Sequence, residues 1–300
     1  MFLYQLALTI IRYLGYPSEV DTNMKFDALA FPMVTFCNYN PYKMAVVNTN
    51  ADFAKIKTLM TEYGAMMNNQ TTTDTYGIQG PTIFDTQMRA MDMLNILGSQ
   101  LTDAQKAPAL YTFTDLVAEC LFSGSYCYSD DFTSFIDPVY GTCFTYHTNR
   151  SIYRAGHQYG LRLLLTTQQE ISTTFAFDYL PVIETAGFRM AVHPQGYYPP
   201  LDNNGFNVGV GMETAVALLM SEIFREKPPY ADCVDRESND TNYYGQYNYT
   251  IESCYFSCIQ RETVKRCGCA NPIYRKSTNM TYCTTAADTE TDLAMAFFAV

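Results

Sequence analysis

Ten cysteines in a chain of 300 residues constrain this fold more than any other feature. Their spacing is irregular and extends over nearly the whole chain, and only three histidines accompany them. A zinc module would more often mix cysteine with histidine or repeat C-x2-C pairs. The chain also carries five N-x-[ST] sequons, at Asn69, Asn149, Asn239, Asn248 and Asn279. Together these features predict a disulfide-bonded glycoprotein of the secretory pathway.

The composition is that of an acidic, folded protein. Hydrophobic residues make up 48% of the chain and aromatic residues 15%, enough for one large domain or a few smaller modules. The net charge of −11 argues against a nucleic-acid partner, which requires a positive face for phosphate. We interpret the acidic surface as a source of solubility, with attraction of cations as the alternative.

The first eleven residues, Met1–Ile11, are apolar and are followed by Arg12. As a helix they would span roughly 16 Å, about half of the ~30 Å hydrocarbon core of a bilayer. They lack the basic leader and the small-residue cleavage site of a signal peptide. We interpret the segment as the outer half of a transmembrane helix, with an ordinary buried helix as the alternative. Pro17 disfavours helical backbone at Tyr16, so the helix should end there.

Hydrophobic periodicity along the rest of the chain predicts an α+β fold. Apolar, β-branched runs indicate strands at residues 30–37, 160–167, 187–193 and, with a helix as the alternative, 213–219. Apolar residues at a spacing of three to four predict helices at 51–68, 84–101 and 112–120. We therefore expect a group of helices inserted into a β scaffold.

The last part of the chain is dense in cysteine. Residues 251–267 are predicted to form a helix that ends at Gly268, with Cys254 and Cys258 one turn apart on one face. Two thiols so placed would bond to a neighbouring antiparallel helix instead of to each other. Cys267, Cys269 and Cys283 complete the cluster. A metal site built from some of these thiols is the alternative, which the secretory signals and the lack of a nearby histidine disfavour.

Six segments, taken in order, resemble the ectodomain of the degenerin/epithelial sodium channel (DEG/ENaC) family. The resemblance covers nearly the whole chain, with Val210 where the family usually has proline. The matching pieces are Tyr16-Pro17, Phe31–Asn38 (FPMVTFCN), Cys120–Cys127 (CLFSGSYC) with Gly141-Thr-Cys143, Gly205–Glu213 (GFNVGVGME), Pro228–Cys233 and Cys254–Cys283.

The resemblance implies a disulfide-rich, hand-like ectodomain that follows a partial transmembrane helix. It assigns residues 1–15 to the outer part of the first transmembrane helix, 16–50 to wrist, palm and β-ball strands, 51–150 to a helical finger, 151–228 to palm, β-ball and knuckle strands, and 229–300 to an incomplete cysteine-rich thumb. It also implies three disulfides: Cys37–Cys143, Cys120–Cys127 and Cys269–Cys283. Each would contribute roughly 2–4 kcal/mol.

Two departures from the family concern the end of the chain. The resemblance places the partners of Cys233, Cys254, Cys258 and Cys267 downstream, where this chain has no further cysteine and carries Thr291 at a position that is often cysteine. The second transmembrane helix, with its Gly-x-Ser selectivity filter, is also absent from the sequence. We therefore expect residues 284–300 to be an aberrant or truncated end, and the polypeptide alone to form no pore.

The resemblance implies a subunit of an amiloride-sensitive, sodium-selective channel at the plasma membrane, with most of the chain extracellular. The channel would be a homo- or hetero-trimer in a lipid membrane, gated by protons, peptides, proteolysis or mechanical load. Paired acidic residues such as Asp130 and Asp131 are candidate proton sensors, although such surface pairs are commonplace. A ring contact between Tyr16 at the wrist and Tyr230 in the thumb would couple the stimulus to the pore. The alternative is that each ring only packs into the hydrophobic core around it.

Two other classes of function compete with a channel. A non-conducting, membrane-anchored or secreted cysteine-rich binding module would also use an apolar anchor and disulfides. An enzyme is disfavoured because the three histidines form no nucleophile, zinc-protease or phosphate-loop pattern. We expect surface or structural roles for the three histidines, His147, His157 and His193. We also expect no cofactor.

Overall fold

The centre of the protein is a five-stranded antiparallel sheet with strand order β10-β9-β2-β6-β5. The computed structural model describes residues 1–16, 21–22, 28–154, 156, 158–168, 178–199, 201–221, 223, 229–230 and 242–284. The sheet strands are β2 (Met33–Asn38), β5 (Phe132–Asp137), β6 (Gly141–Tyr146), β9 (Gly187–His193) and β10 (Phe206–Gly209). Five of the six residues of β2 are buried, because other elements cover both faces of this central strand. The strands predicted at 30–37 and 187–193 are therefore confirmed.

A tight turn joins β5 to β6 at Pro138–Tyr140. Asp137 Oδ1 accepts hydrogen bonds from the backbone nitrogens of Val139 at 2.9 Å and Tyr140 at 3.1 Å. Gly141 follows with a φ of 70°, and a Cβ there would lie 2.5 Å from the carbonyl oxygen of Pro41. Only glycine allows both the positive φ and the close approach of Pro41, and β6 begins at this residue.

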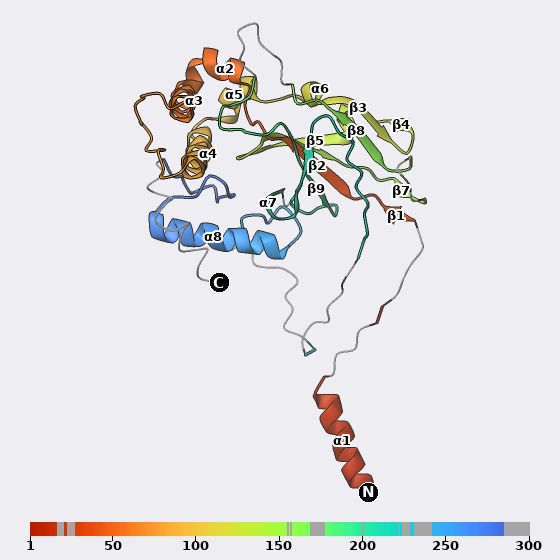
Figure 1. Cartoon of the computed structure of the whole chain (residues 1–300). Helices are drawn as coiled ribbons and strands as arrows, with labels where there is room; N and C mark the ends of the chain where they lie inside the picture. Colours follow the sequence, from red (N-terminus) through yellow and green to blue (C-terminus); the bar gives the residue numbers. More distant parts are fainter. Residues whose placement is uncertain are drawn as a thin grey trace.

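A second sheet packs face to face with the first (Figure 1). It has the order β4-β3-β8, from β3 (Val117–Phe122), β4 (Ser125–Tyr126) and β8 (Leu161–Leu165). The core between the sheets is aromatic: the ring of Phe122 in β3 lies 5.0 Å from Phe31 and 5.6 Å from Tyr146 in β6, centroid to centroid. A short pair, β1 (Leu29–Ala30) with β7 (Ser151–Ile152), lies beside them. The strand predicted at 160–167 is confirmed by β8.

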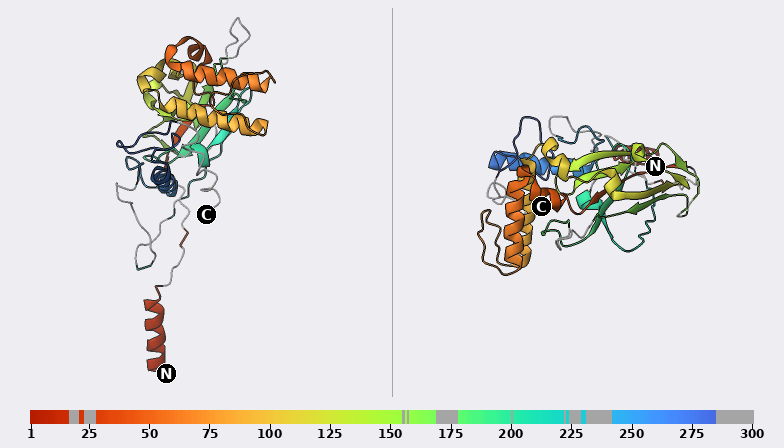
Figure 2. Two further views of the ribbon diagram at one scale, coloured as in Figure 1. Left: turned by 90° about the vertical axis from the view of Figure 1, so that its left-hand side faces the viewer. Right: turned by 90° about the horizontal axis from the view of Figure 1, so that it is seen from above.

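Helices inserted between β2 and β3 form a second hydrophobic core at the opposite end (Figure 2). The two long helices, α3 (Ala54–Met67) and α4 (Ile83–Ser99), lie side by side. Thr82 and Asp85 form a capping box at the start of α4. The predicted helices 51–68 and 84–101 are confirmed. The smaller helices are α2 (Met44–Thr49), η1 (Ala51–Phe53), α5 (Asp103–Lys106), η2 (Ala107–Ala109) and α6 (Phe113–Leu116).

Helix α8 (Ile251–Cys267) runs beneath the five-stranded sheet, on the side where the separate helix α1 (Phe2–Leu14) lies (Figure 1). Thr250 caps the start of α8, and Gly268 ends it with a φ of 74° in the left-handed region, so both predicted ends of the helix are confirmed. The predicted N-terminal helix is also present, and α1 ends at Leu14. Pro17 lies outside the described residues. A single turn, α7 (Leu201–Asn204), precedes β10.

Two predicted elements differ from the structure. Residues 112–120 were expected to be one helix, but α6 ends at Leu116 and β3 begins at Val117, because Val117–Phe122 pairs with β8 and Cys120 bonds to Cys127. Residues 213–219, expected to be a strand, form neither strand nor helix and are exposed. Within the described residues no strand pairs with them, and a strand exists only through its hydrogen-bonded neighbour.

Candidate functional site

Three disulfides cross-link the described part of the chain. Cys37 in β2 and Cys143 in β6 are direct cross-strand partners, fully buried, with Cα atoms 4.4 Å apart. Cys120 bonds to Cys127 across the β3–β4 hairpin, and Cys269 bonds to Cys283 in the residues that follow α8. These are the three pairs that the family resemblance implies.

Four cysteines take no part in these three bonds. Cys254, Cys258 and Cys267 are on α8 itself, where Cys258 is exposed and forms no disulfide with any described residue. Cys233 lies outside the described residues. Whether these thiols have partners downstream stays a prediction.

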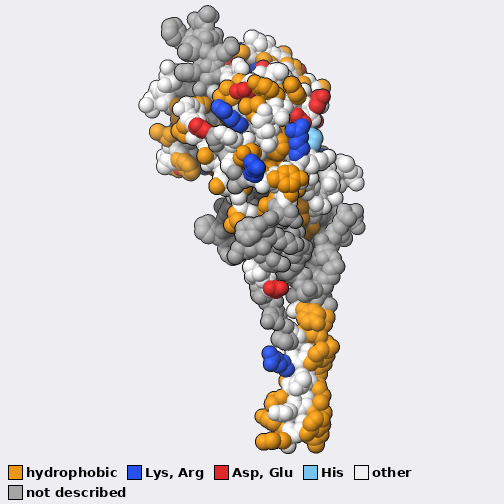
Figure 3. All heavy atoms as spheres, turned by 90° about the vertical axis from the view of Figure 1, so that its right-hand side faces the viewer, with side chains coloured by type: hydrophobic (Ala, Val, Ile, Leu, Met, Phe, Trp, Pro, Cys, Tyr) orange, Lys and Arg blue, Asp and Glu red, His pale blue; other side chains and the backbone are white. Residues whose placement is uncertain are grey.

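Helix α1 exposes apolar side chains along its length, with Gln5, Thr9 and Arg12 as its polar residues. None of its residues is buried, and Phe2, Leu3 and Ile11 are each more than 60% exposed. Figure 3 shows hydrophobic side chains along the whole length of this helix. In the described parts of the chain no helix is both long and apolar enough to cross a bilayer, and α1 has 13 residues. An apolar surface of this kind is normally covered by lipid or by another protein segment.

Tyr16, two residues beyond α1, contacts Tyr230. The ring centroids are 5.4 Å apart and the ring planes are inclined at 83°, an edge-to-face contact. Tyr230 is still 54% exposed, so the contact is on the surface and is no part of a buried core. The residues that flank it, 17–20 and 224–228, lie outside the described residues.

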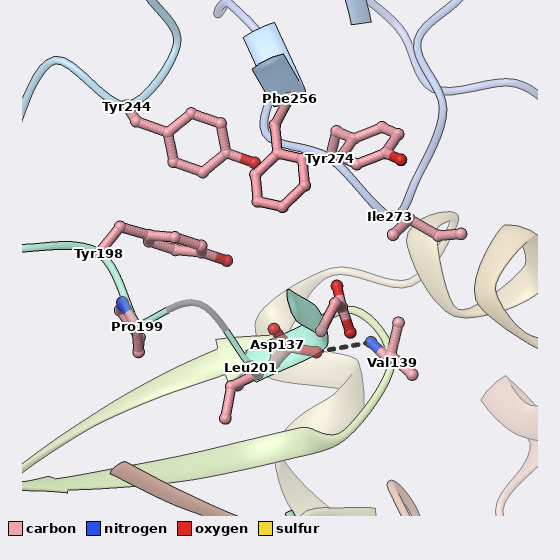
Figure 4. Close-up of a pocket in the computed structure, with 10 residues that line it drawn as sticks. Asp137, Val139, Tyr198, Pro199, Leu201, Tyr244, Phe256, Ile273 and Tyr274 are labelled. Atoms are coloured by element: carbon pink, nitrogen blue, oxygen red, sulfur yellow. Dashed lines mark hydrogen bonds between the residues drawn. The ribbon is translucent and has the colours of Figure 1, made fainter. Parts of the chain in front are cut away.

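A crevice separates the α8 segment, defined here as residues 242–284, from the five-stranded sheet. Figure 4 shows the rings of Tyr244, Phe256 and Tyr274 on one side of it and Tyr198 with Asp137 on the other. Phe256 stacks on Tyr274 with centroids 5.5 Å apart, and Tyr244 lies 6.1 Å from Phe256. The crevice therefore has an aromatic wall from the α8 segment and a floor from the β5–β6 turn and the loop after β9.

One buried carboxyl group lines this crevice. Asp137 is only 8% exposed, and burial raises the pKa of its side chain to about 6. The backbone N–H groups of Tyr140 and Val139 and the positive charge of Arg275 lower that pKa, whereas the neighbouring Asp202 raises it further. Burial also raises the pKa of Tyr244 and of Tyr274 to about 12, so both hydroxyls are neutral at physiological pH.

The crevice was not predicted from the sequence. Its residues come from five separate places in the chain, and no short motif connects them. The one local signal was the density of tyrosine before α8, where four of eight residues are Tyr: Tyr243, Tyr244, Tyr247 and Tyr249.

The other predicted residues lie away from the crevice. Four sequon asparagines are exposed, at Asn69, Asn149, Asn248 and Asn279, while Asn239 lies outside the described residues. Asp130 is exposed and Asp131 half-buried, in the turn before β5.

Two of the three histidines can be placed. His193 is buried, its Nε2 lies 2.8 Å from the hydroxyl of Thr35, and burial lowers its pKa. This is a structural hydrogen bond inside the sheet, in agreement with the predicted role. His147 is half-buried beside β6, and His157 lies outside the described residues.

These features define a class of protein: a disulfide-bonded α+β body that carries an exposed apolar helix at one end. Residues 1–293 match the family model described as amiloride-sensitive sodium channel. The chain belongs to this family, which is a family of ion channels.

Three relatives show how far the similarity extends. The degenerin-like protein asic-2 of Caenorhabditis elegans is 42% identical over 278 residues, which is 91% of this chain and 51% of that protein. The epithelial sodium channel subunit alpha of Neoceratodus forsteri is 25% identical over 353 residues, 93% of this chain and 53% of that protein. Degenerin mec-4 of Caenorhabditis briggsae is 34% identical over 180 residues, 58% of this chain and 22% of that protein. The chain thus spans about half the length of the first two relatives.

Proposed function

We propose that this chain is part of a subunit of a sodium-selective, amiloride-sensitive cation channel gated by a ligand or by mechanical load. The observation that carries the proposal is the match of residues 1–293 to one channel family. The three disulfides support it, because they join the cysteines that the resemblance pairs.

In this proposal α1 is the outer part of the first transmembrane helix, at the plasma membrane. Its exposed apolar side chains support such a position, because lipid would cover them. The two-sheet body corresponds to palm and β-ball, helices α2–α6 to the finger, and the α8 segment to the thumb. Strands β5 and β6 fall within residues 51–150, the range assigned to the finger, yet they pair in the same sheet as β2.

The exposed sequons support an extracellular location for the body. A glycan requires an accessible asparagine, and Asn69, Asn149, Asn248 and Asn279 are exposed. Treatment of the secreted or membrane-bound chain with an N-glycosidase should reduce its apparent mass. An unchanged mass would contradict an extracellular glycoprotein.

A conducting channel needs a pore-forming segment, and this chain spans about half the length of the two relatives that cover most of it. The test is to determine the 3′ end of the transcript and to express the completed subunit, as a homo- or hetero-trimer, in cells. We expect a second apolar span with a Gly-x-Ser motif, and a sodium current that amiloride blocks. Protons, peptides and membrane stretch should be applied in turn, because the sequence does not select among them.

The alternative is a membrane-anchored or secreted cysteine-rich binding module that does not conduct. A stop codon immediately after Val300 in the native transcript, together with the absence of current in every combination of subunits, would favour it. Sodium current from the completed chain would exclude it.

A further inference from the structure

The guanidinium group of Arg275 lies among three tyrosine rings. Its central carbon is 5.2 Å from the ring centroid of Tyr247, 5.5 Å from Tyr198 and 5.9 Å from Tyr244. We call these three rings the tyrosine cage. All three distances are within the ~6 Å at which a cation is attracted by the face of an aromatic ring.

The cage is built from two parts of the fold. Tyr198 belongs to the loop after β9, on the sheet side, whereas Tyr244, Tyr247 and Arg275 belong to the α8 segment. Arg275 therefore contacts a ring from each side of the junction. A backbone hydrogen bond from Asn248 N to Gly196 O, 2.9 Å long, joins the same two parts.

The rings also contact one another. Tyr198 lies 4.7 Å from Tyr244 and 5.4 Å from Tyr247, both edge-to-face, and Tyr244 is 2% exposed. The cage walls thus support each other through contacts that do not involve the arginine. A cage of this kind is preorganised for its occupant, which lowers the entropic cost of binding.

The hydrogen bonds and charges around the cage suit a planar cation. The Nη2 atom of Arg275 lies 3.4 Å from the hydroxyl of Tyr247, a long bond, so the ring faces contribute most of the contact. Asp137, on the floor of the adjoining crevice, supplies negative charge, and its pKa is lowered in turn by Arg275. A guanidinium stacks on aromatic faces and is weakly hydrated, whereas an ammonium is compact and strongly hydrated.

We propose that the tyrosine cage is a guanidinium-binding site, and that its resident group, Arg275, clamps the α8 segment onto the loop after β9. The clamp is a property of the folded chain and holds whether or not the complete protein conducts ions. When the resident side chain is removed, a small guanidinium compound takes its place and restores the junction.

The test uses the whole 300-residue chain and its R275A variant. Amide hydrogen exchange is measured in residues 195–198 and 242–250, with β2 and β6 as internal references. We expect roughly tenfold faster exchange in these two segments of R275A, the size expected for the loss of a cation from aromatic faces. R266A is the matched control, because it removes a half-exposed arginine whose pair with Glu262 is on the surface of α8. It should leave both segments unchanged.

Methylguanidinium is then added to R275A at concentrations that leave wild-type exchange unchanged. We expect exchange in the two segments to return toward the wild-type rate, and methylammonium to restore much less. Unchanged exchange in R275A, no recovery with methylguanidinium, or equal recovery with methylammonium would each overturn the proposal. If R275A does not fold, Y198L takes its place, since it removes only the ring on the sheet side. Faster exchange of residues 242–250 in Y198L supports the clamp, and unchanged exchange overturns it.

Discussion

The ring of Tyr16 meets the ring of Tyr230 edge-to-face, with centroids 5.4 Å apart. Tyr16 follows the exposed helix α1 by two residues, and Tyr230 precedes the α8 segment by twelve. The contact therefore connects the apolar helix to the part of the chain that borders the crevice. In the proposed channel this is a route by which movement of the α8 segment reaches the membrane.

Replacement of Tyr230 by alanine tests that route in the completed channel. An aromatic pair contributes about 0.5–1.5 kcal/mol beyond burial, so Y230A should reduce the current evoked by the stimulus while surface expression is retained. Y230F keeps the ring and should behave as wild type. A Y16A/Y230A double variant should be no worse than either single variant, because both remove the same contact. Additive losses in patch-clamp recordings would show that the two rings act separately.

The disulfides should differ in their effect on stability. Cys37 and Cys143 are 106 residues apart in the sequence, whereas Cys120 and Cys127 are 7 apart. Because a longer closed loop restricts the unfolded chain more, C37S/C143S should lower the free energy of unfolding by about 4–5 kcal/mol and C120S/C127S by about 2 kcal/mol. Urea denaturation without reductant measures both. Equal losses would indicate that local packing, not loop length, determines the effect.

Asp137 predicts a pH dependence of stability. Burial raises its pKa to about 6 in the folded protein, so the folded state holds this proton more tightly than the unfolded state does. The contribution of this group to stability is then largest below its unfolded pKa and falls as pH rises through about 6. D137N retains an oxygen for the N–H groups of Val139 and Tyr140 and has no charge. Its stability relative to wild type should be roughly 1 kcal/mol more favourable at pH 7.5 than at pH 5.

Asp115 is a control for the pH dependence expected of Asp137. Its Oδ2 atom lies 2.8 Å from Nζ of Lys43. Partial desolvation raises the pKa of Asp115, but hydrogen bonds from Lys43 and Thr112 outweigh it and the net shift is downward. D115N should therefore show the opposite trend, with its largest loss at neutral pH. The same trend in both variants would show that the Asp137 environment has been misread.

Two glycines should respond in opposite directions to alanine. Gly268 has a φ of 74° at the end of α8, and no atom within 4 Å would contact an added Cβ. G268A should therefore lose about 1 kcal/mol through backbone strain alone. Gly64, inside α3, also has open space around it, and G64A should gain about 0.5–1 kcal/mol because alanine favours the helix. Thermal unfolding of both variants checks the pair, and a shift of the same sign in both would contradict it.

Elements whose signals are local were predictable. The helix at 251–267 has a capping threonine before it and a glycine after it, and β9 is mostly apolar, with Arg189 as its one charged residue. The region 112–120 was misassigned because its apolar spacing is helical, whereas pairing with β8 and the bond to Cys127 make its second half a strand. Tertiary contacts overrode local preference there.

The crevice and the tyrosine cage illustrate what the sequence does not reveal. Tyr198 and Arg275 are 77 positions apart and have no periodic relationship, so only the packing of α8 beneath the sheet brings them together. The disulfide pairing, by contrast, was accessible through family resemblance, although spacing alone allows many pairings.

The bond between Cys37 and Cys143 has one further consequence. The strands that it joins, β2 and β6, are adjacent, so the disulfide closes a covalent loop that contains the helices, the β3–β4 hairpin and β5. A protease that cuts an exposed connection in this loop, such as residues 68–77, would produce two fragments that stay tethered by sulfur. We therefore expect the disulfide to hold β2 and β6 in register even when the helices between β2 and β3 are cut, lengthened or exchanged.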